Sequence, residues 1–182
     1  MSLKFSQNPF KILLHLEQKS KVKVKQFPSQ EEFRKKWSGI TFELNGKQLL
    51  TPMAEVSEVM LQPSMTHVPG VKSWVLGIVN SRGNLLPVMD LHALLFNKNR
   101  RTVLNRQRIL VVNHSQIAAG LLVDAVSGIK HFWVDDRSDR VPEMPSELKP
   151  FVTHSYRLKE KYYGVFDLLR LVNSDIFSDV EI

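Results

Sequence analysis

The sequence contains no cysteine, which excludes disulfide bonds, thiolate metal sites and cysteine nucleophiles. Long hydrophobic runs are also missing, because no apolar stretch approaches the roughly 20 residues that a membrane-spanning helix needs. The short apolar segment FKILLHL carries Lys11 and His15 and is followed by no small-residue cleavage site, so no signal peptide is expected. Together these absences are typical of a cytoplasmic protein.

Sequence motifs for catalysis are missing as well. No glycine-rich phosphate loop, nucleophile elbow or kinase motif occurs. The histidines are scattered, and none joins carboxylates at the spacing of a metal site. They are His15, His67, His92, His114, His131 and His154. The sequence therefore predicts no metal, no cofactor and no enzymatic activity.

Two aspartates close apolar segments and need a role. Asp90 ends LLPVMD as a phosphoacceptor would, but a phosphoacceptor also needs acidic Mg²⁺ ligands from the end of another strand. The first expected strand offers none, since it runs into Asn45-Gly46-Lys47. Asp90 is therefore predicted to cap the short helix LHALLF. Asp124 in LLVDAV is likewise expected to be a turn or cap residue.

The charge is unevenly distributed along the 182 residues. Residues 1–36 hold nine Lys/Arg and three Glu, so they carry +6 of the formal net charge of +7. The remaining body is close to neutral. This argues against nucleic-acid binding by the body, which would need a positive field over one face.

Residues 1–36 are predicted to form a basic helical extension. Residues 9–20 carry a broad apolar stripe behind a proline suited to a first helical position. Residues 29–32 form a capping-box pattern before a short helix that reaches Lys36. The amphipathic segment suits docking on its own domain or on a partner, and an anionic membrane surface is the alternative.

From Trp37 onward the hydrophobic period changes to two. Asn45-Gly46 predicts a type I′ hairpin, and a second hairpin is expected to join WVLGIVN and LLPVMDL, with Gly83 at positive φ. AEVSEVMLQP, RILVVN and IAAGLLVDAV are further strand candidates, and HSYRLKEKYYGVF predicts a last hairpin before the helix LLRLVN. Short strands and tight turns favour a mainly β fold of small antiparallel barrels. No internal repeat is evident, which leaves open two barrels of similar shape.

The polar, basic segment 97–108 is predicted to be a junction between subdomains or a long loop. Its arginines and lysine suit phosphate contacts, but no aromatic residues alternate with them, as single-strand binding would require for stacking. A solvated loop is favoured.

Five sequence blocks occur together in a recognisable order. They are Val56-x-Glu58-Val59, Val68-Pro69-Gly70, Gly77-x-Val79-Asn80-x-Arg82-Gly83, Pro87-Val88-x-Asp90-Leu91 and Gly120-x-x-Val123-Asp124-x-Val126. From about Trp37 to Val172 the chain resembles the CheW-like domain family. The resemblance implies a CheW-like fold over 37–178, with two five-stranded SH3-like barrels side by side and no catalysis.

The resemblance also implies partners. With its extension, the chain is most similar to the CheW-type adaptors of the chemosensory system that controls type IV pili and twitching motility. Such an adaptor links a methyl-accepting receptor, here one resembling PilJ, to a CheA-type histidine kinase, here one resembling ChpA. The receptor tip would enter a groove between the barrels, and the CheW-like domain of the kinase would pack on the barrel ends.

The residues expected to bind partners follow position by position. Glu58 and Arg82 match the acid–arginine pair of the family, and the pair is expected to hold the arginine as a rigid donor array. Ser81 departs from the apolar residue, usually leucine, that the family commonly has there. The full set is Val56, Glu58, Gly77, Asn80, Arg82, Gly83, Val126 and Ile129. Two alternatives remain: a small β-barrel that binds nucleic acid through 97–108 and the N-terminal lysines, and a CheW-fold module that sequesters the kinase without contacting a receptor.

Overall fold

The computed structural model describes residues 35–97, 104–114 and 117–181. The helix predicted over 9–20 and most of the one predicted after residue 29 lie outside these ranges. Lys36, expected at the end of the second helix, is instead the first residue of strand β1. Within the described residues, no helix is long and apolar enough to cross a membrane.

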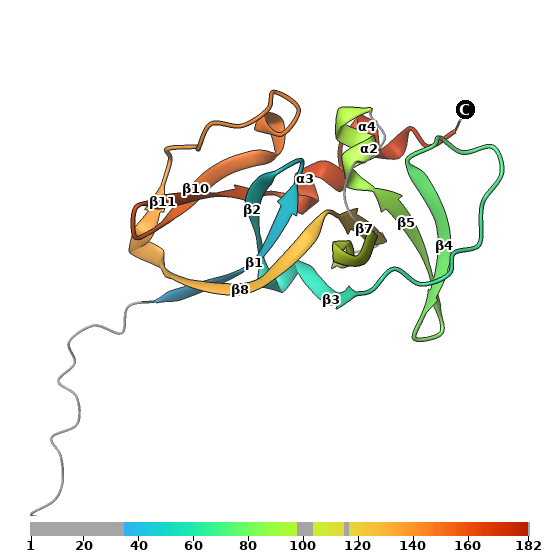
Figure 1. Cartoon of the computed structure of the whole chain (residues 1–182), viewed down its shortest axis with the longest axis horizontal. Coiled ribbons are helices and arrows are strands. Elements are labelled where there is room, and N and C mark those ends of the chain that lie inside the picture. Colours follow the sequence, from blue (N-terminus) through green and yellow to red (C-terminus); the bar gives the residue numbers. More distant parts are fainter. Residues whose placement is uncertain (1–34, 98–103, 115–116, 182) are drawn as a thin grey trace, which may run out of the picture. The chain divides into compact units, whose positions relative to one another are not determined.

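Two sheets make up the described body (Figure 1). The six-stranded sheet has the order β8-β1-β2-β11-β10-β9, and the five-stranded sheet has the order β3-β6-β7-β5-β4. In the first are β1 (Lys36–Leu44), β2 (Lys47–Pro52), β8 (Ala125–Trp133), β9 (Arg137–Ser138), β10 (Val152–Leu158) and β11 (Lys161–Phe166). In the second are β3 (Val56–Met60), β4 (Val75–Ser81), β5 (Asn84–Asp90), β6 (Arg108–His114) and β7 (Ile117–Val123).

The predicted mainly β fold of two small strand bodies is confirmed, with one addition and one difference. The sixth strand of the larger sheet, β9, is only two residues long. Each sheet also contains one parallel pair, β2 with β11 and β5 with β7, although purely antiparallel barrels were expected. All other strand pairs are antiparallel, so both sheets show the same run of antiparallel, antiparallel, parallel and antiparallel neighbours.

The predicted hairpins form where the turn residues placed them. Asn45 and Gly46 have φ of 49° and 72°, the left-handed values that a type I′ turn needs between β1 and β2. Gly83 has φ of 88° between β4 and β5, as expected, and Arg82 before it is also left-handed at 53°. Lys159 at 58° makes the turn between β10 and β11. Local turn chemistry therefore sets all three hairpins.

Short helices follow the strands. Asp90 caps α2 (Leu91–Phe96), since its side chain accepts a hydrogen bond from the Ala93 amide, which confirms the predicted cap. α3 (Leu168–Val172) begins at Asp167 in the same way, and α4 (Asp175–Ser178) follows it. Asp124 is a turn residue, and its carboxylate accepts from the Asn45 amide at 2.7 Å. The remaining turns are 3₁₀ helices: η1 (Met53–Glu55), η2 (Leu104–Arg106), η3 (Val134–Asp136) and η4 (Lys149–Phe151).

The junction predicted at 97–108 is wrong. The strands on either side of that segment, β5 and β6, belong to the same sheet. The chain crosses between sheets at η1, and again at Asp124, which divides the expected strand IAAGLLVDAV into β7 and β8. Polar composition carries no information about which sheet the flanking strands join.

One apolar core links the two sheets. Its buried members include Phe42 from the six-stranded sheet and Leu110 from the five-stranded sheet, together with Leu91 and Leu168 from the helices. Residues 35–182 accordingly form one compact unit. Two smaller clusters lie apart from this shared core, one in each sheet. The two sheets therefore share one core within one compact unit.

Candidate functional site

The expected acid–arginine pair is present. Arg82 Nη2 lies 3.2 Å from Glu58 Oε2, with the arginine side chain 78% exposed and the glutamate 32% exposed. Glu58 is on β3 and Arg82 follows β4, which are the two outer strands of the five-stranded sheet. Thr66 and Ile78 exchange two backbone hydrogen bonds of 2.9 Å, which attach the segment after β3 to β4 and bring the two edges together. The structure confirms the predicted pairing.

Local contacts fix the backbone of the turn that carries Arg82. Asn80 Oδ1 accepts a hydrogen bond of 2.8 Å from the Gly83 amide. Arg82 occupies the left-handed region, which costs a non-glycine residue roughly 1–2 kcal/mol. Asn80 and Gly83 are therefore turn-forming residues, and the described contact of the guanidinium is its ion pair with Glu58.

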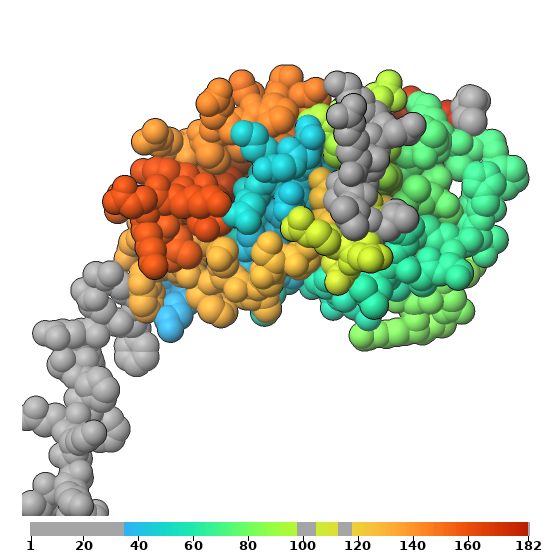
Figure 2. Space-filling view, in the orientation of Figure 1, coloured from blue at the N-terminus to red at the C-terminus, as the bar shows by residue number. Residues whose placement is uncertain are grey.

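A hollow of about 190 Å³ lies beside this pair. Leu85 is one of its lining residues and is 75% exposed. The hairpin of β4 and β5, coloured green, projects at the lower right in Figure 2. Its other lining residues are Ser57, Ser81, Asn84, Leu86, Val111 and Ala118. Leu85 was missed in the sequence, although alternation along NLLPVMD places Leu86 and Val88 inside and Leu85 outside.

The chemistry of this site is that of a contact surface. An exposed ion pair stabilises a fold by only about 0–1 kcal/mol, so folding does not explain it. An oriented guanidinium next to an exposed leucine and a small hollow suits recognition of an apolar side chain with a carboxylate nearby. No cluster of three metal-ligating side chains occurs among the described residues.

The other predicted residues lie in two further locations, one on β3 and β8 beside the shared core and one in the interior. Val56 on β3 and Val126 on β8 are half-buried against the shared core, and Ile129 on β8 is 54% exposed. Val56 and Val126 lie at the start of β3 and β8, directly after the two crossovers between the sheets, and with Ile129 they are called the seam residues below. Gly77 is buried with φ of 139°, and a Cβ there would lie 2.4 Å from the Thr66 carbonyl oxygen. Gly77 therefore permits closure of the sheet and presents nothing to the surface.

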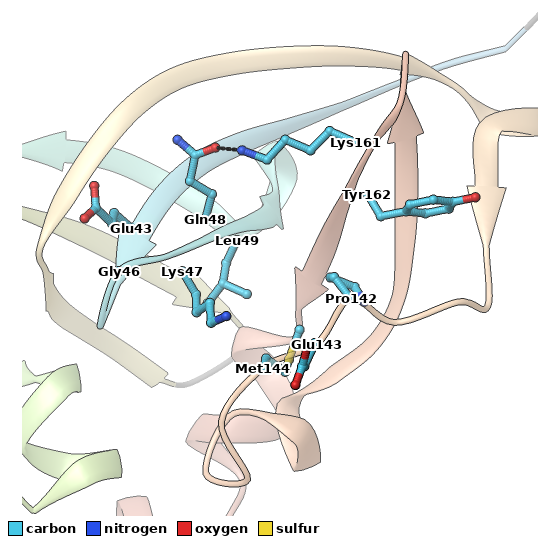
Figure 3. A pocket seen from close by; sticks show the side chains of 10 residues that line it. All are labelled: Glu43, Gly46, Lys47, Gln48, Leu49, Pro142, Glu143, Met144, Lys161 and Tyr162. Atoms are coloured by element: carbon cyan, nitrogen blue, oxygen red, sulfur yellow. Dashed lines mark hydrogen bonds between the residues drawn. The ribbon is translucent and has the colours of Figure 1, made fainter.

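A larger hollow, of about 370 Å³, lies on the six-stranded sheet (Figure 3). Leu49 and Met144 contribute buried apolar surface to it, and Lys161 donates a 2.6 Å hydrogen bond to Gln48 Oε1 at its edge. Both signs of charge line it, with Glu43, Lys47 and Glu143 among the lining residues. The sequence analysis did not predict this hollow.

Comparisons with known proteins agree with this geometry. The sequence model of one family, the CheW-like domain, matches residues 38–175. Protein PilI of Pseudomonas aeruginosa is 39% identical over 176 residues, which cover 97% of this chain and 98% of PilI. Chemotaxis protein CheW of Bacillus subtilis is 30% identical over 90 residues, which cover 50% of this chain and 57% of that protein. The crystal structure of scaffolding protein TtCheW from Thermoanaerobacter tengcongensis superposes with a TM-score of 0.66 at 24% identity, over 78% of this chain and 95% of that one, and shows a shared fold.

Proposed function

This chain belongs to the CheW-like domain family, and from that premise we propose that it is a non-catalytic adaptor coupling a methyl-accepting chemoreceptor to a CheA-type histidine kinase. Similarity to PilI along almost the whole chain supports a place in the array that controls type IV pilus twitching motility. The receptor would then resemble PilJ and the kinase ChpA. The adaptor would work in the cytoplasm, associated with membrane-bound receptors.

The observation that carries the proposal is the Glu58–Arg82 pair beside its hollow, within a chain that matches the family over residues 38–175. The pair lies on a surface hairpin and contributes little to folding. Its exposed guanidinium is held in one direction before any partner arrives, so less side-chain entropy is lost on docking. The seam residues Val56, Val126 and Ile129 supply a second contact region on the same body.

Binding to two partners tests the coupling role. The purified full-length chain is titrated with the cytoplasmic tip fragment of the receptor and, separately, with the C-terminal domain of the kinase. An adaptor binds both, whereas capture of the kinase alone favours the sequestering alternative. Binding of neither fragment contradicts both readings.

Arg82→Ala separates a docking residue from a structural one. We expect the free energy of unfolding to change by no more than about 1 kcal/mol, because the pair is exposed. The affinity for the receptor fragment or the kinase domain should fall, since the oriented donor array is lost. Arg170→Ala is a suitable control, because it removes an arginine from α3, well separated in sequence from the hairpin. A collapse of the melting temperature would identify Arg82 as structural.

The nucleic-acid alternative makes a distinct prediction. Most of the charge excess lies in residues 1–36, and half of the basic segment 97–108 falls outside the described residues. The binding of a fluorescently labelled, unrelated DNA duplex is measured by fluorescence anisotropy from about 50 to about 200 mM salt. A nucleic-acid binder would show a steep loss of affinity over about that salt range.

A further inference from the structure

The connection between β3 and β4 is long and irregular. Residues 61–74, all within the described ranges, belong to no helix or strand, and most of them are exposed. Two isolated backbone bridges attach this connection, Thr66 with Ile78 of β4 and Val71 with Glu181. The first bridge brings together the two edges that carry the ion pair of the candidate site. Irregular connections longer than about 12 residues are usually functional, so the second bridge needs a role.

The second bridge is made by a segment that follows the six-stranded sheet. Residues 175–181, called the strap below, begin with α4 and end beside the connection (Figure 1). Phe177 is 7% exposed in the core shared by the two sheets, and Val180 packs against the same core. The Lys72 amide donates a 2.9 Å hydrogen bond to the Val180 carbonyl oxygen, and the Lys72 ammonium group pairs with the Asp179 carboxylate. The strap therefore reaches from one half of the body to the edge of the other.

The interactions that hold the strap are modest. α4 is a single turn of four residues, far below the roughly 12–15 residues at which an isolated helix becomes stable. The Asp179 side chain is 71% exposed, so salt screens its pairing with Lys72. Burial of the Phe177 ring is then the main anchor. Such a segment belongs to the parts of a fold that open locally at low free energy.

We propose that the strap positions the docking site, so that opening of the strap weakens partner binding while the rest of the body stays folded. Opening would release Val71 and Lys72, which lie in the same connection as Thr66. The bridge between Thr66 and Ile78 would then lose its support on the side away from β4, and the edges that carry the ion pair would separate more readily. The inference deepens the proposed function and rests on it, because it takes that ion pair as the docking site.

The expected size of the effect follows from the closed fraction of the strap. If only the closed strap presents the complete site, the apparent dissociation constant equals the intrinsic constant divided by that fraction. In the wild type the buried Phe177 ring keeps the fraction close to one, so locking the strap should change the affinity little. A tenfold loss of affinity corresponds to a closed fraction of about one tenth. Phe177 and Asp179 are positioning residues in this scheme, because they act through the connection.

A disulfide can lock the strap, because the chain has no cysteine of its own. The Lys72 amide bonds to the carbonyl oxygen of Val180. This pattern makes Val71 and Glu181 a non-hydrogen-bonded antiparallel pair, whose Cα atoms lie about 4.5 Å apart, within the range of a disulfide. The full-length Val71→Cys/Glu181→Cys variant is compared oxidised and reduced, alone and combined with Phe177→Ala.

Hydrogen exchange of backbone amides measures the coupling without a partner. The Lys72 amide reports opening of the strap, and the Thr66 and Ile78 amides report the bridge. Phe177→Ala should accelerate exchange of all three by a similar factor, about tenfold or more, and oxidation of the two cysteines should reverse this. Acceleration of Lys72 alone, or of none of the three, would overturn the inference. Exchange of Thr66 and Ile78 only through global unfolding, at the rate of the β1 amides, would overturn it as well.

Calorimetric titration then measures docking, with the receptor tip fragment and the kinase C-terminal domain as probes. Phe177→Ala should weaken by about tenfold the binding of whichever fragment Arg82→Ala weakens, and the oxidised disulfide should restore it. Asp179→Lys, which places two cations together, should weaken this binding a few fold at low salt, and Lys72→Asp/Asp179→Lys should recover it. Ile176→Ala is the matched control, because Ile176 is 52% exposed on α4.

The outcomes separate this inference from the proposed function. An oxidised disulfide that restores the melting temperature of Phe177→Ala but not its affinity shows that the strap is structural only, and the adaptor role stands. If the wild-type chain binds a fragment and Arg82→Ala binds it equally well, the docking site lies elsewhere and the inference fails. If the wild-type chain binds neither fragment, the adaptor role fails, and hydrogen exchange alone decides whether the strap holds the bridge.

Discussion

The two sheets repeat one backbone plan, and their registers correspond position by position. Val56 in β3 lies opposite Val112 in β6, and Val126 in β8 lies opposite Phe42 in β1. Each of these edge strands has an irregularity directly after its valine, where a serine stands in both. The bridge between Thr66 and Ile78 likewise corresponds to the pairing of β9 with β10.

The far ends of the sheets correspond as well. The turn after β4 has Arg82 at φ 53°, and the turn after β10 has Lys159 at φ 58°. The strand after each turn ends in a capping aspartate, Asp90 or Asp167, followed by a short helix. A basic left-handed turn residue therefore occurs in both sheets.

One difference lies at an edge position. Glu58 on β3 pairs with Arg82, whereas the corresponding position on β8 is Gly128. The six-stranded sheet thus has the basic turn but lacks the acid that would hold it. The same backbone plan carries the Glu58–Arg82 ion pair in one sheet and leaves Ile129 and Trp133 of β8 exposed in the other. Chemistry at the edges, and not topology, distinguishes the two.

The largest expected effect comes from a substitution in the shared core. Phe42 is fully buried and meets Phe166 edge to face at 5.9 Å. Phe42→Ala should lower the free energy of unfolding by about 3–5 kcal/mol, and Phe42→Leu by less than about 1.5 kcal/mol. Because the core spans both sheets, hydrogen exchange should accelerate in both to the same extent. Loss of protection confined to the six-stranded sheet would show that the two fold independently.

A smaller effect is expected where the sheets differ locally. Gly77 corresponds to His154 in register, but only Gly77 has a carbonyl oxygen, that of Thr66, where its Cβ would be. Gly77→Ala should destabilise the fold by about 1–3 kcal/mol through strain at positive φ and this clash. Gly83→Ala is the control, because Gly83 also has positive φ but has open space around it. Equal costs in chemical denaturation would mean that the contact with Thr66 is unimportant.

The two aspartate caps sharpen the comparison. Asp90 Oδ1 lies 3.0 Å from the Ala93 amide, and Asp167 Oδ1 lies 2.8 Å from the Arg170 amide. Asp90→Ala and Asp167→Ala should each cost about 1 kcal/mol in thermal or denaturant unfolding, and the asparagine variants less. If one of the two alanine variants is as stable as the wild type, the two helix caps contribute differently to stability despite their equivalent geometry.

The sequence allowed the local features to be predicted because local chemistry determines them. Asn45-Gly46 specifies a hairpin and Asp90 a helix cap through their nearest neighbours alone. The order of strands in each sheet depends on contacts distant in sequence, so the crossover at Asp124 was missed. β8 was missed for a different reason: its irregularity at Ser127 and its exposed face disturb the alternation by which strands are recognised.

The repeat could have been read from the sequence with closer attention. VSEV at residues 56–59 matches VSGI at 126–129, and VMDLHAL at 88–94 matches VFDLLRL at 165–171. Each match is short, and the two are separated by different lengths of chain, so no fixed period reveals them. The pairing of Glu58 with Arg82 was predictable only through the family resemblance, since the residues are on opposite edges of a curled sheet.

The smallest expected effect concerns the crossovers. Glu55 ends the first crossover, and Ala125 is its counterpart after the second. Burial, and secondarily the Asp167 carboxylate, raises the pKa of Glu55 above its ordinary value of 4.5, although the Leu168 amide donates to it. The folded state therefore binds more protons than the unfolded state above that pH, and the contribution of Glu55 to stability decreases as pH rises through its folded pKa.

Glu55→Gln removes this charge and keeps an oxygen that can accept from the Leu168 amide. The variant should match the wild type near pH 4 and exceed it at pH 7 by less than about 1 kcal/mol, since the side chain is only half-buried. Denaturant unfolding at pH 4, 5.5 and 7 measures the difference, and Glu160→Gln in the exposed turn is the control. A variant that is less stable at pH 7 than the wild type would mean that the charged form of Glu55 stabilises α3, and that the crossover acid is a favourable addition missing from the other sheet.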